Sequence, residues 1–190
     1  ADSFEQRLPI AGDLFGAGWR KRFDTSTANR PALVAYQSKL AAAAQAGGVA
    51  VYQARDAATS AMAALPVWAV TSLAVGGVLP LTGELFDLVI IDEAAQSDIA
   101  SAIPLLYRAR RAMVIGDPNQ LSHITSVGRD RDGALARFHE LDPKVHQALG
   151  YETTSLYTAA ASVSKDEPIF LRHHFRSHPQ IAEFASTTFY

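Results

Sequence analysis

The amino-acid sequence predicts an α/β fold with a central parallel sheet, and three observations carry this prediction. Residues 88–91 and 112–115 are short apolar runs, as expected for strands that are buried on both faces of a sheet. Strand-like and helix-like segments alternate along the chain, which is typical of βαβ units. Each apolar run is followed by a polar cassette, at residues 92–96 and 116–121.

Two Ala-rich helices are predicted ahead of the sheet. Residues 1–27 show no clear periodicity and are expected to form an irregular lead-in. Thr27 or Asn29 can cap the first helix, which is expected to end at the glycine pair 47–48. A second helix is expected over about residues 52–64.

The other elements follow from local patterns. A helix is expected to begin at Ser97, with Asp98 in its first turn, and Pro104 is expected to kink or split it. The remaining predictions are a strand at 67–70, short helices within 128–150, a helix at 155–163, a strand at 168–171 and a closing helix from 178 to about 188.

Composition limits the class of protein. The 190 residues suffice for one domain of ordinary size or slightly more, and 48% of them are hydrophobic. A net charge of −2, with 13 Arg and 4 Lys, argues against a dedicated basic nucleic-acid module. The absence of cysteine excludes disulfides and thiolate metal sites. The sequence shows no signal peptide and no apolar run of the roughly 20 residues that span a bilayer, so a soluble, cytoplasmic protein with no membrane partner is expected.

Acidic residues gather at the predicted carboxyl edge of the sheet. Ligands bind beyond this edge in open parallel sheets, so Asp92, Glu93 and Asp117 are expected on one rim. Clustered carboxylates of this kind usually serve a divalent metal and the phosphates that it carries. Two simpler explanations remain open. Asp and Glu also favour helix N-termini, and the sequence Asp117-Pro118-Asn119 also favours a turn.

Taken together, the two cassettes resemble motif II (DEAxQ, here 92–96) and motif III (GDxxQL, here 116–121) of superfamily 1 helicases. Residues 171–181 are similar to motif IV of the same family, in which an aromatic-Arg-Ser element precedes a Pro and an apolar helix. Residues 66–73, with 79–81 behind them, resemble the segment before motif II in one branch of the family. This branch includes the nonsense-mediated-decay helicases.

The resemblance covers about residues 66–127 and 168–190, and it implies an incomplete RecA-like P-loop NTPase domain at 66–190. Residues 1–65 would then be an irregular lead-in and helical insertion. Members of the family use ATP and Mg²⁺ to move along single-stranded DNA or RNA. This chain has no G-x-x-x-x-G-K-[ST] loop, and none of its four Lys residues follows a Gly. It is therefore expected to be inactive in isolation, with the missing loop upstream in a longer parent protein.

The family also implies a role for each matching residue. Asp92 would bind Mg²⁺ through water, and Glu93 would be the general base for the attacking water. Gln120 would sense the γ-phosphate, and Asp117 would couple the nucleotide state to the bound strand. Gln96 belongs to the same nucleotide-binding set.

Several other residues have a possible functional role, and some of them also have a structural interpretation. Arg176 would be the arginine finger, whose guanidinium suits the charge spread over phosphoryl oxygens. Thr71 and Ser72 would lie near nucleic-acid phosphates, although a Thr-Ser pair at a strand end also serves as a helix cap. Trp68 can stack on a base, but a Trp in an apolar strand is more typical of a core. Zinc binding is not expected of three histidines, because their spacing fits no standard site and no thiol is present: His173, His174 and His178.

Two alternatives to a helicase motor remain. The absent phosphate loop is compatible with a non-catalytic nucleotide-sensing or protein-interaction module on a helicase-like scaffold. A metal-dependent nuclease would combine the rim carboxylates with Asp87, but Asp87 precedes its strand and should lie at the opposite edge. A sheet that lacks the phosphate-loop strand would also expose an edge, which favours self-association unless the N-terminal helices cover it.

Overall fold

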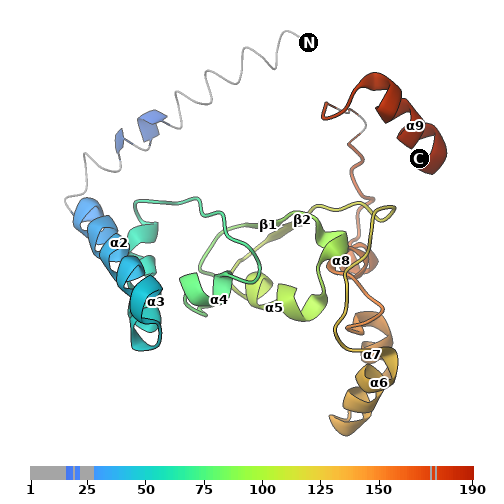
Figure 1. Cartoon of the computed structure of the whole chain (residues 1–190), viewed down its shortest axis with the longest axis horizontal. Coiled ribbons are helices and arrows are strands. Elements are labelled where there is room, and N and C mark those ends of the chain that lie inside the picture. Colours follow the sequence, from blue (N-terminus) through green and yellow to red (C-terminus); the bar gives the residue numbers. More distant parts are fainter. Residues whose placement is uncertain (1–15, 19, 22–27, 172, 174) are drawn as a thin grey trace. The chain divides into compact units, whose positions relative to one another are not determined.

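The computed structural model of the protein describes residues 16–18, 20–21, 28–171, 173 and 175–190 (Figure 1). Most of the expected lead-in at 1–27 lies outside these residues. The chain forms two compact units, which meet in the sequence between Thr82 and Gly83. No helix among the described residues is both long enough and apolar enough to cross a membrane.

The first unit is built on a pair of helices, α2 (Asn29–Ala46) and α3 (Val49–Met62), which lie side by side (Figure 1). Both glycines between them have a positive φ, 60° at Gly47 and 55° at Gly48, a conformation that strains other residues. The predicted end of the first helix is therefore confirmed. The capping prediction is wrong for Asn29, which is buried inside α2, and Thr27 lies outside the described residues.

The expected strand at 67–70 is wrong, because these residues are irregular. The indole of Trp68 donates a 2.6 Å hydrogen bond to the carbonyl of Leu65, and its ring packs edge-on against Tyr36 at 5.4 Å between centroids. This packing turns the segment back onto the helix pair and gives Trp68 a structural role. The short helix α4 (Val75–Val78) follows.

The second unit contains a parallel pair of strands, β1 (Val89–Ile91) and β2 (Ala112–Val114), joined through α5 (Ile99–Tyr107) (Figure 1). The register pairs Val89 with Ala112 and Ile91 with Val114. Both strands and their parallel direction are confirmed. The structure thus shows a small parallel α/β sheet, while the complete RecA-like fold stays a prediction.

Only one face of this sheet is covered by the described residues. Its core joins strand, loop and helix side chains that are buried together: Ile91, Ala94, Ala102 and Leu156. On the other face Ile90 is 57% exposed and Met113 49% exposed. The expectation that the strands are buried on both faces is therefore wrong for this structure.

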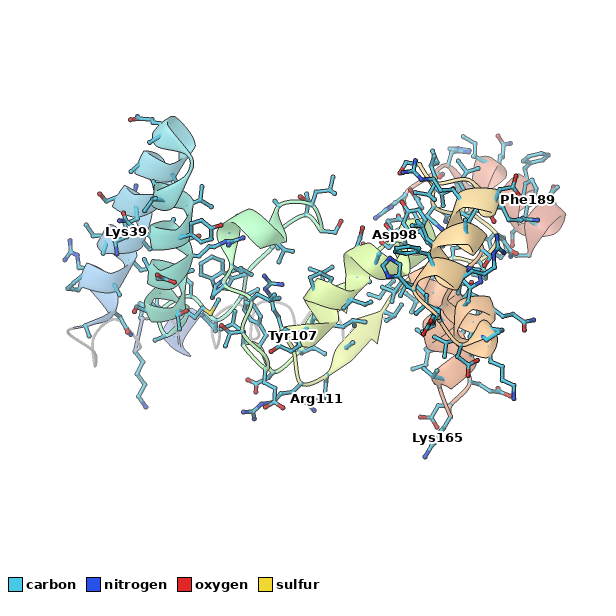
Figure 2. The ribbon with its side chains drawn as sticks, turned by 90° about the horizontal axis from the view of Figure 1, so that it is seen from below. Lys39, Asp98, Tyr107, Arg111, Lys165 and Phe189 are labelled. Atoms are coloured by element: carbon cyan, nitrogen blue, oxygen red, sulfur yellow. The ribbon has the colours of Figure 1, made fainter. Side chains whose placement is uncertain are left out.

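Asp98, rather than Ser97, caps α5, as its side chain accepts hydrogen bonds from the amide and the hydroxyl of Ser101, at 2.8 and 2.7 Å. Pro104 lies inside α5 without splitting it. Figure 2 labels both ends of this crossover, Asp98 and Tyr107. A single turn of 3₁₀ helix, η1 (Ala94–Gln96), lies between β1 and α5.

The described residues of the second unit form four further helices, and all were expected: α6 (Arg129–Phe138), α7 (Pro143–Leu149), α8 (Leu156–Val163) and α9 (Pro179–Phe189). Local signals explain the starts of α8 and α9. Ser155 accepts a hydrogen bond from the amide of Thr158, and Pro179 occupies the first turn of α9. The strand expected at 168–171 is wrong, because this segment is irregular and Ile169 is 92% exposed.

Candidate functional site

Backbone hydrogen bonds join the two polar cassettes at the carboxyl ends of β1 and β2. The amide of Ile115 donates to the carbonyl of Ile91 at 2.9 Å, and the amide of Ala94 donates back to the carbonyl of Ile115 at 2.8 Å. The pairing thus continues beyond both strands. It delivers Asp92 and Asp117 to the same edge of the sheet, as the parallel arrangement requires.

Gly116 permits this close approach. A Cβ atom at Gly116 would lie 3.0 Å from the backbone nitrogen of Ala95 and 3.1 Å from Cδ2 of Tyr157. Both distances are shorter than ordinary van der Waals contacts. The second cassette can therefore pack against η1 and α8 only because this residue has no side chain.

Asp92, Glu93 and Gln96 form an exposed local network at the end of β1. The Asp92 carboxylate accepts a 2.9 Å hydrogen bond from the amide of Glu93, and the Gln96 side-chain amide donates to Glu93 Oε2 at 3.2 Å. Glu93 has a φ of 54°, in the left-handed region that residues other than Gly seldom adopt. The backbone is thus strained at the residue predicted to be the general base.

Asp117 organises the second cassette. One carboxylate oxygen accepts from the amide of Asn119 at 2.9 Å, and the other accepts from the side-chain amide of Gln120 at 2.9 Å and from the hydroxyl of Tyr190. Partial burial raises the pKa of Asp117, but the hydrogen bonds from these donors outweigh it and leave the pKa below its ordinary value. The group is therefore a carboxylate at neutral pH. This segment is a turn, as the simpler explanation held, and it also carries a charged side chain at the edge.

The donor set at this edge suits Mg²⁺ only in part. The exposed Asp92 carboxylate is the hard oxygen ligand that Mg²⁺ prefers. However, no three His, Asp or Glu side chains among the described residues converge to hold a metal. An ion here would therefore take most of its ligands from water and from phosphate oxygens, which is usual for Mg²⁺. Of the three histidines considered for zinc, the structure describes His173 and His178, and neither belongs to a group of described residues that could hold a metal ion.

The other predicted site residues are Arg176, Thr71 and Ser72. Arg176 is exposed, and within the described part of the chain no hydrogen bond or ion pair links it to either cassette. Thr71 is in the first unit, where its hydroxyl accepts a 3.3 Å hydrogen bond from the amide of Ala74, just before α4. This bond closes the turn before α4, whose N-cap is Ala74 without a side-chain cap hydrogen bond, so the capping alternative for Thr71 and Ser72 is not shown. The phosphate-binding roles of all three residues stay predictions.

Asp87 lies at the opposite edge of the sheet, as expected. It precedes Val89, at the amino end of β1, and its carboxylate lies 3.9 Å from a guanidinium nitrogen of Arg110. The carboxylate of Glu84 lies 3.3 Å from the same guanidinium. Asp87 therefore cannot complete a nuclease-like acidic cluster with Asp92.

Sequence reasoning did not identify Tyr190 as part of the site. Its partner Asp117 lies 73 residues earlier in the chain, so no local pattern could pair the two. The role of Gly116 was also missed, although a glycine that directly follows a predicted strand is a usable signal for close backbone packing.

Known proteins support a helicase relationship. A family model described as an AAA domain matches residues 71–126. Helicase SEN1 of Saccharomyces cerevisiae is 35% identical over 114 residues, which is 60% of this chain and 4% of that protein. Probable helicase MAGATAMA 3 of Arabidopsis thaliana is 33% identical over 127 residues, or 65% of this chain and 13% of that protein. Helicase sen1 of Schizosaccharomyces pombe is 32% identical over 106 residues, which is 55% of this chain and 5% of that protein.

No solved structure matches the chain significantly. The chain spans at most 13% of the length of the curated relatives named above. The matched family segment includes both polar cassettes, and the relatives are all named as helicases. These matches support a relationship to the superfamily 1 helicases, in the branch that includes the nonsense-mediated-decay helicases.

Proposed function

We propose that the chain is part of the motor core of an ATP-dependent DNA or RNA helicase or translocase, in which ATP hydrolysis drives movement along single-stranded nucleic acid. One observation carries the proposal: the backbone pairing of Ala94 with Ile115 sets the acidic pair and the glutamine turn at one sheet edge. The helicase relatives support the same assignment.

Each residue at this edge would have its own role in ATP hydrolysis. Mg²⁺ would neutralise the negative charge that develops on the phosphate oxygens. Asp92 would hold the ion through water, and Glu93, oriented by Gln96, would take a proton from the attacking water. Gln120 would donate its side-chain amide to a γ-phosphate oxygen, and Asp117 would keep that amide in place.

Residues outside this edge complete the proposed assignment. Arg176 would offset charge in the transition state, which requires it to approach the nucleotide on binding. Thr71 and Ser72 would contact nucleic-acid phosphates through their hydroxyls and amides. The RecA-like domain would begin near residue 66, after the helical insertion.

Glu93→Gln in the complete gene product tests the assignment. It should retain ATP binding and lower single-strand-stimulated hydrolysis by about 100-fold or more, because the amide cannot accept the water's proton. Glu140→Gln is a matched control, since Glu140 is also exposed and also has a positive φ, of 52°. Hydrolysis that survives in Glu93→Gln would refute the proposal.

The second candidate is a non-catalytic nucleotide-sensing or protein-interaction module. It is favoured by the absence of a G-x-x-x-x-G-K-[ST] loop from these 190 residues. The two candidates differ in turnover. If the complete gene product binds ATP but shows no hydrolysis that depends on Glu93, the second candidate stands.

Self-association is proposed for the isolated chain. The described sheet has two strands, so β1 and β2 each have one edge without a partner strand. Such edges present unpaired amides and carbonyls to other chains. Analytical ultracentrifugation over a range of concentrations should show dimers or larger species, and a monomer at every concentration would contradict this.

A further inference from the structure

The C-terminal end of α9 is attached to the GDxxQL loop by two hydrogen bonds. The hydroxyl of Tyr190 donates to Asp117 Oδ2, and the side-chain amide of Asn119 donates to the carbonyl of Phe189 at 3.3 Å. Figure 2 labels Phe189 at this end of the chain. These contacts bridge 73 and 70 residues of sequence, so they belong to the tertiary structure of the unit.

The contact reaches Gln120 through Asp117. Asp117 Oδ2 accepts from Tyr190 and also from the side-chain amide of Gln120, while Oδ1 accepts from the backbone of Asn119. Each carboxylate oxygen can accept two hydrogen bonds, so all three donors are satisfied together. The side chain of Gln120 also hydrogen-bonds Tyr190, so Tyr190 contacts Gln120 directly as well as through Asp117.

We propose that Tyr190 is a positioning residue for hydrolysis: its hydroxyl fixes Asp117, and Asp117 in turn presents the Gln120 amide to a phosphate oxygen. This inference rests on the proposed function. The physical reason is entropic. Gln120 is exposed, and an exposed Gln side chain samples many rotamers unless a neighbour holds it.

Removing the Tyr190 hydroxyl leaves Asp117 bonded to the loop but free of α9. The Asp117 carboxylate then has only donors from its own loop, and Gln120 follows its motion. Loss of this positioning role lowers the fraction of nucleotide-bound complexes in which the Gln120 amide is correctly placed. This reduces kcat more than it changes KM.

The first experiment tests the contact between Tyr190 and Asp117 in the 190-residue chain. The side-chain amide signals of Gln120 in ¹⁵N NMR, assigned by their loss in Gln120→Ala, should shift in Tyr190→Phe. Asp117→Asn should move the same signals. Tyr107→Phe removes an exposed hydroxyl in the same unit and should leave them in place. Unchanged Gln120 signals in Tyr190→Phe would overturn the proposal.

The second experiment measures ATP hydrolysis by the complete gene product. Tyr190→Phe should lower kcat by about 10-fold with little change in KM, whereas Tyr107→Phe should match the wild type. Glu93→Gln shows whether this edge catalyses hydrolysis at all. Loss of activity in Glu93→Gln with a wild-type kcat in Tyr190→Phe would overturn the positioning role alone. Full activity in Glu93→Gln would overturn the proposed function, and the Gln120 signals would still decide whether Tyr190 holds Asp117.

Discussion

The backbone amide of Ala94 donates a 2.8 Å hydrogen bond to the carbonyl of Ile115, so the first residue after the acidic pair is attached to the residue before Gly116. The two cassettes are therefore joined directly through the backbone and do not depend on side-chain contacts to stay together. A change in the packing of one cassette should consequently reach the other.

Gly116→Ala should destabilise the second unit. The added methyl would meet the backbone nitrogen of Ala95 at 3.0 Å, and backbone atoms yield less readily than a flexible side chain. Overpacking of this kind costs about 1–3 kcal/mol of unfolding free energy, which chemical denaturation can measure.

Gly133→Ala is the matched control for this substitution. Gly133 lies inside α6, where a Cβ would meet Nη1 of Arg137 at an ordinary 3.5 Å. Alanine in a helix interior should raise the unfolding free energy by about 0.5–1 kcal/mol. A Gly116→Ala chain that is as stable as the wild type would show that the cassettes do not need this close approach.

Leu156→Ala should separate α8 from the sheet. Leu156 is 4% exposed and packs with Ile91 and Ala94, beneath the first cassette. Cavities left by such substitutions cost about 2–5 kcal/mol in unfolding free energy. Val163→Ala, on the same helix but 78% exposed, should change the midpoint of denaturation little. Equal losses for the two variants would contradict the assigned core.

The correctly predicted elements are those with local signals. Each sheet strand is a short apolar run with a polar cassette behind it, and Ser155 and Pro179 mark the starts of α8 and α9. The edge that the cassettes share could be predicted too, since parallel strands end on the same side.

The errors concern features that depend on distant partners. Residues 67–70 and 168–171 have the composition of strands, but an apolar run does not specify a neighbouring strand. Trp68 packs on Tyr36 instead, and Ile169 stays exposed. For the same reason the attachment of Tyr190 to Asp117 could not be anticipated.

Glu93→Gly should stabilise the fold while it removes the proposed base. A Glu at a φ of 54° is strained, and glycine adopts this conformation without steric cost. The gain in unfolding free energy should be up to about 1 kcal/mol, with loss of ATP hydrolysis in the complete gene product. Glu140→Gly, at a φ of 52°, should show the same gain and keep its activity. Destabilisation by Glu93→Gly would indicate that the carboxylate contributes more to folding than its backbone strain costs.

The hydrogen bond between Tyr190 and Asp117 should make local stability depend on pH at both extremes. Hydrogen bonding to Asp117 raises the pKa of Tyr190 above its ordinary value of 10.0. The contribution of Tyr190 is thus complete below that value and is lost as the pH rises through the raised pKa. Burial raises the pKa of Asp117, but the hydrogen bonds from Tyr190, Asn119 and Gln120 together outweigh it and lower the pKa. The contribution of Asp117 is therefore lost as the pH falls through the lowered value.

Ultraviolet titration of the tyrosine phenols can measure the raised pKa of Tyr190. The difference between the wild type and Tyr190→Phe isolates this one phenol from the six tyrosines, including Tyr36, whose pKa burial raises. Asp117→Asn removes the negative acceptor, so the phenol should titrate closer to its ordinary pKa of 10.0. Asp132→Asn, which alters a carboxylate that pairs with His146 at 3.0 Å, should leave the difference curve unchanged. An unshifted curve in Asp117→Asn would mean that the two groups do not interact, and α9 would then lack the side-chain half of its attachment to the loop.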